Sequence, residues 1–315
     1  MALLGDNDEC YNCARMHFLM RKSVFFVALT LAVPIVLLPA GRREYSNELA
    51  ETSFPSDTEL PGQLEIASML EAVCPGRIVT GEGAGCRGDC PEYTAFSGED
   101  MTREVVGVTL GHFLSPTSDD AAVSVRGCEP HIMNFGGTVL VTRRSGRWSM
   151  LWYKAGVDTS RCRKVSLRDH REILVCIGEY GGQGNIWTAL YVEDLSSPKP
   201  ALMADGREFF TAYDNTQTCG ESWDGGTCPL VRSHIHRVEF KDSANGDPPA
   251  ILVSASYGRK ATTPAVVSAC MNGQTRSLPR TRDHRIEFIF DGHDYRPAPS
   301  SVGEARIFAR QSTCQ

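Results

Sequence analysis

The apolar positions of this chain form one long run near its start and many short runs after residue 100. The long run, Ser23–Ala40, contains no charged residue and follows Arg21 and Lys22. The short runs are rich in β-branched and aromatic residues, and turns containing Gly, Pro, Asn or Asp separate them. This pattern predicts an all-β body of short antiparallel strands, either propeller-like or a sandwich, behind one N-terminal hydrophobic helix.

Individual elements can be placed from the same pattern. Arg144-Ser145-Gly146 and Asp291-Gly292 lie between apolar runs and predict two hairpins. Helical spacing is clear at Gln63–Val73, which ends before Pro75-Gly76, and is nearly absent afterwards. The expected strands are 105–110, 121–125, 138–142, 148–153, 173–177, 186–192, 238–240, 251–255 and 286–290.

The hydrophobic run has a length between those of two targeting segments. A signal peptide has an apolar core of about 7–15 residues, whereas a spanning helix needs about 20. Leu38 is large for a cleavage site that ends at Ala40. We favour an uncleaved anchor that holds the protein in the membrane, and a cleaved signal is the alternative. Either one places the body outside the cytosol, as the basic flanks also suggest.

These assignments divide the chain into four parts. Residues 1–22 form a cytosolic tail, 23–40 the transmembrane anchor or signal core, 41–60 a flexible acidic linker, and 61–315 a disulfide-supported β domain. A further hypothesis makes Cys10 and Cys13 a cytosolic sensor element, which requires translation from Met1 rather than from Met16 or Met20.

Cysteine usage predicts an oxidising compartment. The sequence has 12 cysteines, and most of them follow the hydrophobic run at wide, irregular spacings that indicate disulfides. Their connectivity stays open; Cys219 with Cys228 is the favoured local pair, and the Cys86–Cys90 spacing would also suit zinc. The disulfide candidates are Cys74, Cys86, Cys90, Cys128, Cys162, Cys176, Cys219, Cys228, Cys270 and Cys314.

Charge excludes one class of partner. The net charge is −6 and no long basic run occurs, so a nucleic-acid partner is not expected, because phosphate contacts need clustered Lys and Arg. The length of 315 residues allows one large β domain or two small ones.

Three segments repeat an acidic turn followed by a strand of small apolar residues: Gly111–Val125, Ser166–Cys176 and Glu239–Ser256. In the first, Phe113 precedes Asp119-Asp120; in the third, Phe240 precedes Asp242, Asn245 and Asp247. On these residues the chain resembles FG-GAP or VCBS repeats, the blades of integrin-α-type β-propellers.

The resemblance covers roughly a third of the body and implies a propeller-like fold with a binding or scaffold role. Family members that bind calcium use a D-x-D-x-D-G loop, from which DSANGD departs. Two interpretations of Asp242, Asn245 and Asp247 therefore stay open. They bind calcium, or they form a turn in which their side chains bond the nearby backbone.

The strongest metal candidates are His234 and His236, which share one face if they lie on a strand. Two imidazoles can bind zinc or copper if a third ligand comes from elsewhere, such as Asp224 or His131. A solvated strand face is the alternative. No G-x-S-x-G nucleophile motif occurs in the sequence.

The sequence therefore predicts an extracytoplasmic binding or structural protein of the cell envelope, membrane-anchored or secreted, with a protein or glycan ligand. The alternative is an extracytoplasmic metal-dependent hydrolase that uses His234 and His236.

Overall fold

The computed structural model describes most of the chain after residue 50. The described residues are 51–60, 62–80, 83–87, 102–127, 136–182, 184–196, 208–220, 228–243 and 246–309. They belong to one compact unit, Glu48–Gln315. The predicted tail and hydrophobic helix lie outside the described residues. Within the described ranges, none of the helices has both the length and the apolar content needed to cross a bilayer.

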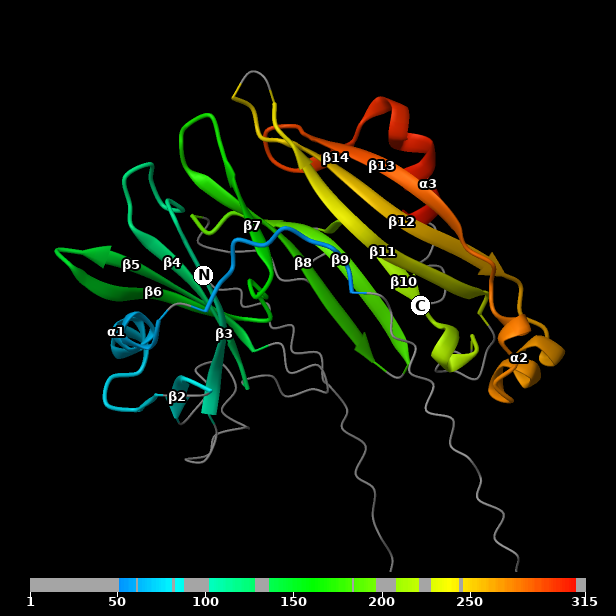
Figure 1. The fold of residues 1–315 in the computed structure, drawn as a ribbon, viewed down its shortest axis with the longest axis horizontal. Coiled ribbons are helices and arrows are strands. Elements are labelled where there is room, and N and C mark those ends of the chain that lie inside the picture. Colours follow the sequence, from blue (N-terminus) through cyan, green and yellow to red (C-terminus); the bar gives the residue numbers. More distant parts are fainter. Residues whose placement is uncertain are drawn as a thin grey trace, which may run out of the picture. The chain divides into compact units, whose positions relative to one another are not determined.

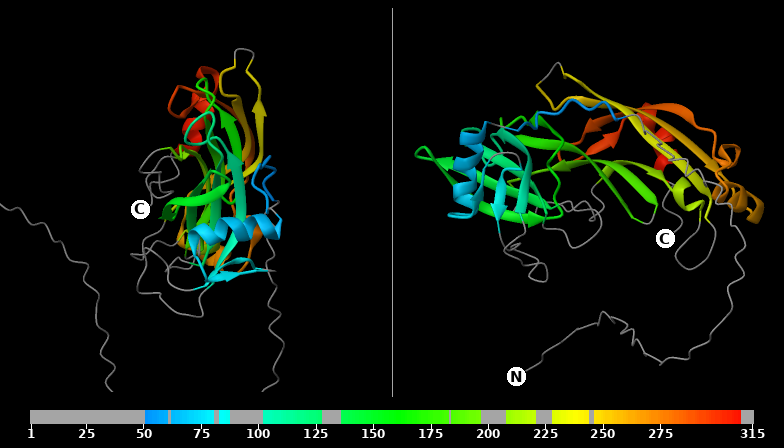
Figure 2. Two further views of the ribbon diagram at one scale, coloured as in Figure 1. Left: turned by 90° about the vertical axis from the view of Figure 1, so that its left-hand side faces the viewer. Right: turned by 60° about the horizontal axis from the view of Figure 1, so that its bottom comes forward.

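Two antiparallel sheets dominate this unit, and in each one successive strands pair with their neighbours along the chain (Figure 1). The longer sheet curls into a half-barrel (Figures 1 and 2). The six-stranded sheet contains β1 (Ile78–Val79), β2 (Gly85–Arg87), β3 (Thr102–Gly111), β4 (Asp120–Arg126), β5 (Gly137–Arg144) and β6 (Arg147–Ala155). The eight-stranded sheet contains β7 (Cys162–Ser166), β8 (Glu172–Gly182), β9 (Asn185–Glu193), β10 (Glu208–Asp214), β11 (Leu230–Lys241), β12 (Ala250–Lys260), β13 (Arg282–Phe290) and β14 (Tyr295–Pro297).

The all-β prediction is confirmed, and so are both hairpins. Ser145 and Gly146 alone connect β5 to β6, and their φ angles of 50° and 79° are those of a two-residue hairpin turn. The expected helix is α1 (Gln63–Val73).

Two helices were not expected from the sequence, α2 (Pro264–Met271) and α3 (Val302–Ala309). Helical spacing, which is nearly absent from the sequence after Val73, therefore did not reveal these two helices of eight residues each. Both helices are short, so a helical period has little length in which to show itself.

Three apolar clusters form the core. The largest lies on one face of the eight-stranded sheet and includes Phe308 of α3. The second lies between the six-stranded sheet and α1, which contributes Met69 and Leu70. The third joins the sheets, because Leu140 of β5 and Leu174 of β8 both belong to it. Burial of the side chains in the third cluster therefore stabilises the packing of the two sheets against each other.

Residues 51–60, which we call the strap, cross from one sheet to the other. At its start, the backbone N–H of Ser53 donates to the carbonyl of His236 at 2.9 Å, and the N–H of Val238 donates to Ser53 at 2.9 Å. Ser53 thus forms a parallel bridge with β11 at Arg237.

Further along the strap, the N–H of Asp57 donates to the carbonyl of Cys162 on β7 at 2.7 Å. Glu59 and Val108 of β3 exchange two backbone hydrogen bonds at 3.0 and 2.7 Å. The predicted linker, 41–60, thus ends in a segment whose backbone is bonded to strands of both sheets at Ser53, Asp57 and Glu59.

Disulfides are confirmed wherever the structure describes both cysteines. Three bonds join Cys74 to Cys86, Cys162 to Cys176, and Cys219 to Cys270. Cys228 is disulfide-bonded as well. The candidates Cys90, Cys128 and Cys314 lie outside the described residues.

The favoured local pair was wrong, because Cys219 bonds to Cys270 and not to Cys228. Cys219 ends a short 3₁₀ helix (Thr216–Thr218) in the left-handed conformation, with its Cα 5.7 Å from that of Cys270. Loop-closure entropy changes slowly with loop length. Proximity in sequence therefore says little about which cysteines pair.

The three acidic segments that resemble one another occupy equivalent places in the fold. Gly111–Val125 contains the β3–β4 connection, Ser166–Cys176 the β7–β8 connection, and Glu239–Ser256 the β11–β12 connection. In the described part of the chain, the sequence repeat thus coincides with a period of four strands. The resemblance to propeller repeats stays a prediction.

Candidate ligand-binding groove

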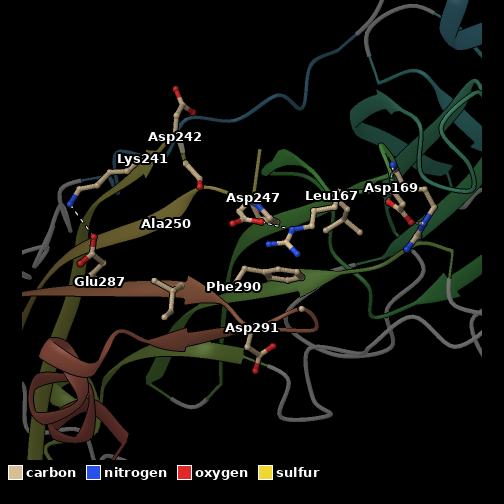
Figure 3. A pocket seen from close by; sticks show the side chains of 15 residues that line it. Leu167, Asp169, Lys241, Asp242, Asp247, Ala250, Glu287, Phe290 and Asp291 are labelled. Atoms are coloured by element: carbon tan, nitrogen blue, oxygen red, sulfur yellow. Dashed lines mark hydrogen bonds and ion pairs between the residues drawn. The ribbon is translucent and has the colours of Figure 1, made fainter. Parts of the chain in front are cut away.

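A groove with a volume of about 780 Å³ lies where three strand connections meet at one end of the eight-stranded sheet (Figure 3). The β7–β8, β11–β12 and β13–β14 turns form it, so two of the three equivalent acidic segments contribute. Its volume falls within the range of roughly 300–1,000 Å³ that is typical of small-ligand sites. Its described lining comprises Leu167, Arg168, Asp169, Arg171, Lys241, Asp242, Ser243, Asp247, Pro248, Ala250, Glu287, Ile289, Phe290, Asp291 and Gly292.

The β7–β8 turn is fixed by its own hydrogen bonds. The N–H groups of His170 and Leu167 donate to the carbonyls of Leu167 and Arg171, at 2.9 and 2.8 Å. His170 takes a φ of 64°, a left-handed conformation that lets the chain reverse. This tight reversal directs the side chains of Leu167 and Arg168 toward the groove that they line.

One ion pair crosses the groove between two of its turns. The Nε of Arg168 lies 2.5 Å from Oδ1 of Asp247, although 79 residues separate the two in sequence. The hydrogen bond from this guanidinium lowers the pKa of the Asp247 carboxyl below its usual value. Figure 3 shows Asp247, Leu167 and Phe290 extending into the same space.

The β13–β14 turn is held by Asp291. Its Oδ1 accepts the N–H groups of His293 and Asp294, each at 2.9 Å, and its Oδ2 accepts Nε of Arg296 at 3.1 Å. These bonds, led by the two backbone donors, lower the pKa of Asp291 to about 2. The turn therefore carries a fixed negative charge beside the ring of Phe290 at neutral pH.

Carboxylates outnumber cations in the described lining. Three residues are basic and five are acidic. Lys241 is paired with Glu287 at 3.2 Å. Asp242 forms no ion pair within the described part of the chain. The groove therefore combines an apolar patch with an excess of negative charge.

The remaining equivalent connection, β3–β4, lies beside the groove. The N–H of His112 donates to Oε2 of Glu172 at 2.8 Å, and the N–H of Glu172 donates to the carbonyl of His112 at 3.0 Å. Nη1 of Arg171 also approaches the carbonyl of Phe113, at 3.5 Å. The three acidic connections thus form one continuous row across both sheets.

The histidine pair predicted from the sequence lies on β11, away from the groove lining. A bulge falls between Ile235 and Arg237, so His236 is the extra residue, yet the rings of His234 and His236 lie 4.9 Å apart. Nε2 of His236 is 3.9 Å from Asp283, whose side chain is 92% exposed. The metal site at these histidines stays a prediction; the suggested ligands Asp224 and His131 lie outside the described residues.

The proposed calcium ligands are divided. Asp242 and Asp247 both line the groove, whereas Asn245 lies outside the described residues. Asp247 already has a guanidinium as its partner. Among the residues that the structure describes, no three His, Cys, Asp or Glu side chains are grouped to hold a metal ion.

Sequence reasoning singled out Asp242 and Asp247 but missed Leu167, Arg168 and Phe290. The repeated acidic turns were the one available signal, because equivalent turns can gather at one end of a sheet. No protein-family model, curated protein or solved structure matches this chain.

Proposed function

We propose that this chain is an extracytoplasmic binding protein. Its ligand site is the groove formed by the β7–β8, β11–β12 and β13–β14 turns at one end of the eight-stranded sheet. In the same proposal, residues 23–40 direct the protein out of the cytosol, either as a membrane anchor or as a cleaved signal. The observation that carries this proposal is that three separate turns line a single groove of about 780 Å³.

The disulfides support the proposed extracytoplasmic location. Disulfides persist in oxidising environments and are rare in the cytosol. Cys162–Cys176 joins two neighbouring strands and Cys219–Cys270 fastens α2, so the bonds are distributed through the fold.

The mixed lining supports binding. Small-ligand sites combine apolar contact area with a few placed polar groups. Leu167 and Phe290 supply apolar surface at the edge of the main core, and Asp247 supplies a charged group between them. The β7–β8 and β13–β14 turns carry internal hydrogen bonds, so these two sides of the groove are held in place by the protein itself.

The test is a ligand screen on the full-length chain, with thermal stabilisation as the readout. An Ala250→Trp variant fills the groove, and Ala265→Trp on the exposed surface of α2 is the matched control. We expect ligands that stabilise the parent and the control protein but not Ala250→Trp. A library in which every hit stabilises all three proteins equally contradicts the groove as the site.

The metal-dependent hydrolase remains the second candidate, favoured by the adjacent rings of His234 and His236. Zinc titration of the full-length chain tests it. Binding of about one equivalent that is lost in His234→Ala supports it, and the same affinity in both proteins opposes it.

A further inference from the structure

We propose that the groove takes a ligand with an ammonium or guanidinium group on an apolar body, and that Arg168 occupies the place of that cation until the ligand displaces it. The inference rests on the proposed binding function of the same groove. It adds the chemical class of the ligand and an internal competitor for its site.

Asp247 is the group that would receive the ligand's cation. Its side chain is 34% exposed and extends into the groove, where it already accepts a hydrogen bond from a guanidinium (Figure 3). A bond between a carboxylate and an Arg side chain is directional and charge-assisted. The contact with Arg168 therefore shows which chemistry this position accepts.

The competing cation is easy to displace. The side chain of Arg168 is 79% exposed and reaches across from the β7–β8 turn. Exposed ion pairs of this kind change an equilibrium by about fivefold or less. A ligand that forms the same bond and also buries apolar surface would therefore replace Arg168 at Asp247.

Two other charged groups in the lining, Arg171 and Asp291, have more hydrogen-bond partners than Asp247 has. Arg171 donates to Asp169, Asp194 and Ser196 at 3.0, 3.2 and 2.7 Å. Asp291 is fixed by two backbone donors of its own turn. Asp247 and Glu287 are the lining carboxylates whose ion-pair partner lies on another strand or turn, and Arg168 at Asp247 is more exposed (79%) than Lys241 at Glu287 (53%).

The apolar part of the ligand has a defined place. Leu167 and Phe290 are partly buried against the main core and line the groove with Pro248 and Ala250. The face of an aromatic ring such as Phe290 attracts a cation within about 6 Å of its centre. An anionic ligand would instead meet an excess of carboxylates and be repelled.

The experiment compares three probes with one aromatic body on the full-length chain, by isothermal titration calorimetry at pH 7. They are 2-naphthylmethylamine, 2-naphthylmethanol and 2-naphthoate, which are cationic, neutral and anionic. We expect the amine to bind most tightly. Arg168→Gln should tighten amine binding about two- to fivefold, and Asp247→Asn should weaken it about tenfold.

A matched control separates displacement from a general change in charge. Arg143→Gln removes an exposed Arg whose partner is Asp119, on the six-stranded sheet, and should leave amine affinity unchanged. If Arg143→Gln strengthens binding as much as Arg168→Gln, or Arg168→Gln has no effect, displacement of Arg168 is refuted.

Two other outcomes separate the inference from the proposed function. Naphthoate binding as tightly as the amine overturns the cationic class, while the groove remains the site. Failure of all three probes also overturns that class. The proposed function itself fails only if the screened library also yields no ligand sensitive to Ala250→Trp.

Discussion

Glu172 and His112 form a reciprocal pair that joins the two sheets. Oε2 of Glu172 accepts the N–H of His112 at 2.8 Å, and the N–H of Glu172 donates to the carbonyl of His112 at 3.0 Å. The first bond depends on the Glu172 side chain, and the second belongs to the backbone alone. The side chain of Glu172 can therefore be tested without removing both bonds.

We expect Glu172→Ala to lower the free energy of unfolding by about 1.5 kcal/mol, because a hydrogen bond to a charged acceptor is lost. Urea denaturation measures the change. Glu172→Gln keeps an oxygen acceptor and should recover part of it. Equal losses in the two variants would show that the acceptor is not what matters.

Substitution of Asp120 should lower the free energy of unfolding more than substitution of its neighbour Asp119. Asp120 is fully buried, and its Oδ2 accepts the N–H groups of Phe113 and Leu114 and the hydroxyl of Ser118. We expect Asp120→Ala to cost roughly 2–3 kcal/mol of unfolding free energy, since three donors lose their acceptor.

The control is Asp119→Ala, at an exposed carboxylate 3.8 Å from Arg143. It should cost less than about 0.5 kcal/mol, as expected for an exposed ion pair. Similar costs for the two substitutions would contradict the role of Asp120 in holding the β3–β4 turn.

The Cys219–Cys270 disulfide should determine how firmly α2 is held. None of the residues of α2 is buried, and the bond closes a separation of 51 residues. Replacing both cysteines by Ser should cost about 4 kcal/mol on the chain-entropy model. Hydrogen exchange should show faster exchange in α2 than in β12. Equal protection of α2 before and after the change would be the contrary result.

Acid should weaken the β13–β14 turn. The pKa of Asp291 is about 2 in the fold, below the value of about 3.9 for an unfolded Asp. The folded state therefore binds fewer protons, and its stability falls as the pH falls from about 4 to about 2. The loss of unfolding free energy between pH 5 and pH 2 should be smaller in Asp291→Asn. Parallel curves for the variant and the parent would refute this.

The sequence predicted strands best where turn chemistry and alternation agree. Ser145-Gly146 supplies the two positive φ angles of a hairpin, so its flanking strands were found. Strand β10 reads EFFTAYD, and its aromatic residues could have identified it. Helix α2 also had a signal, because Thr263 caps it and Pro264 is its first residue.

The groove could not be predicted in the same way. Arg168 and Asp247 belong to turns of different hairpins, and only the curl of the sheet brings them together. The repeated acidic segments indicated that such turns recur, but not which of them become neighbours. For the same reason, the partner of Cys219 could not be read from sequence proximity.

The strap determines how a mechanical force would enter the fold. A pull on the chain ahead of Glu51 first reaches Thr52 and Ser53, which are bonded to β11. If those bonds break, the load passes to Asp57, which is bonded to β7, and then to Glu59, which is bonded to β3. A protein held by its N-terminal segment would thus transmit tension to both sheets in succession, with β11 as the first point of resistance.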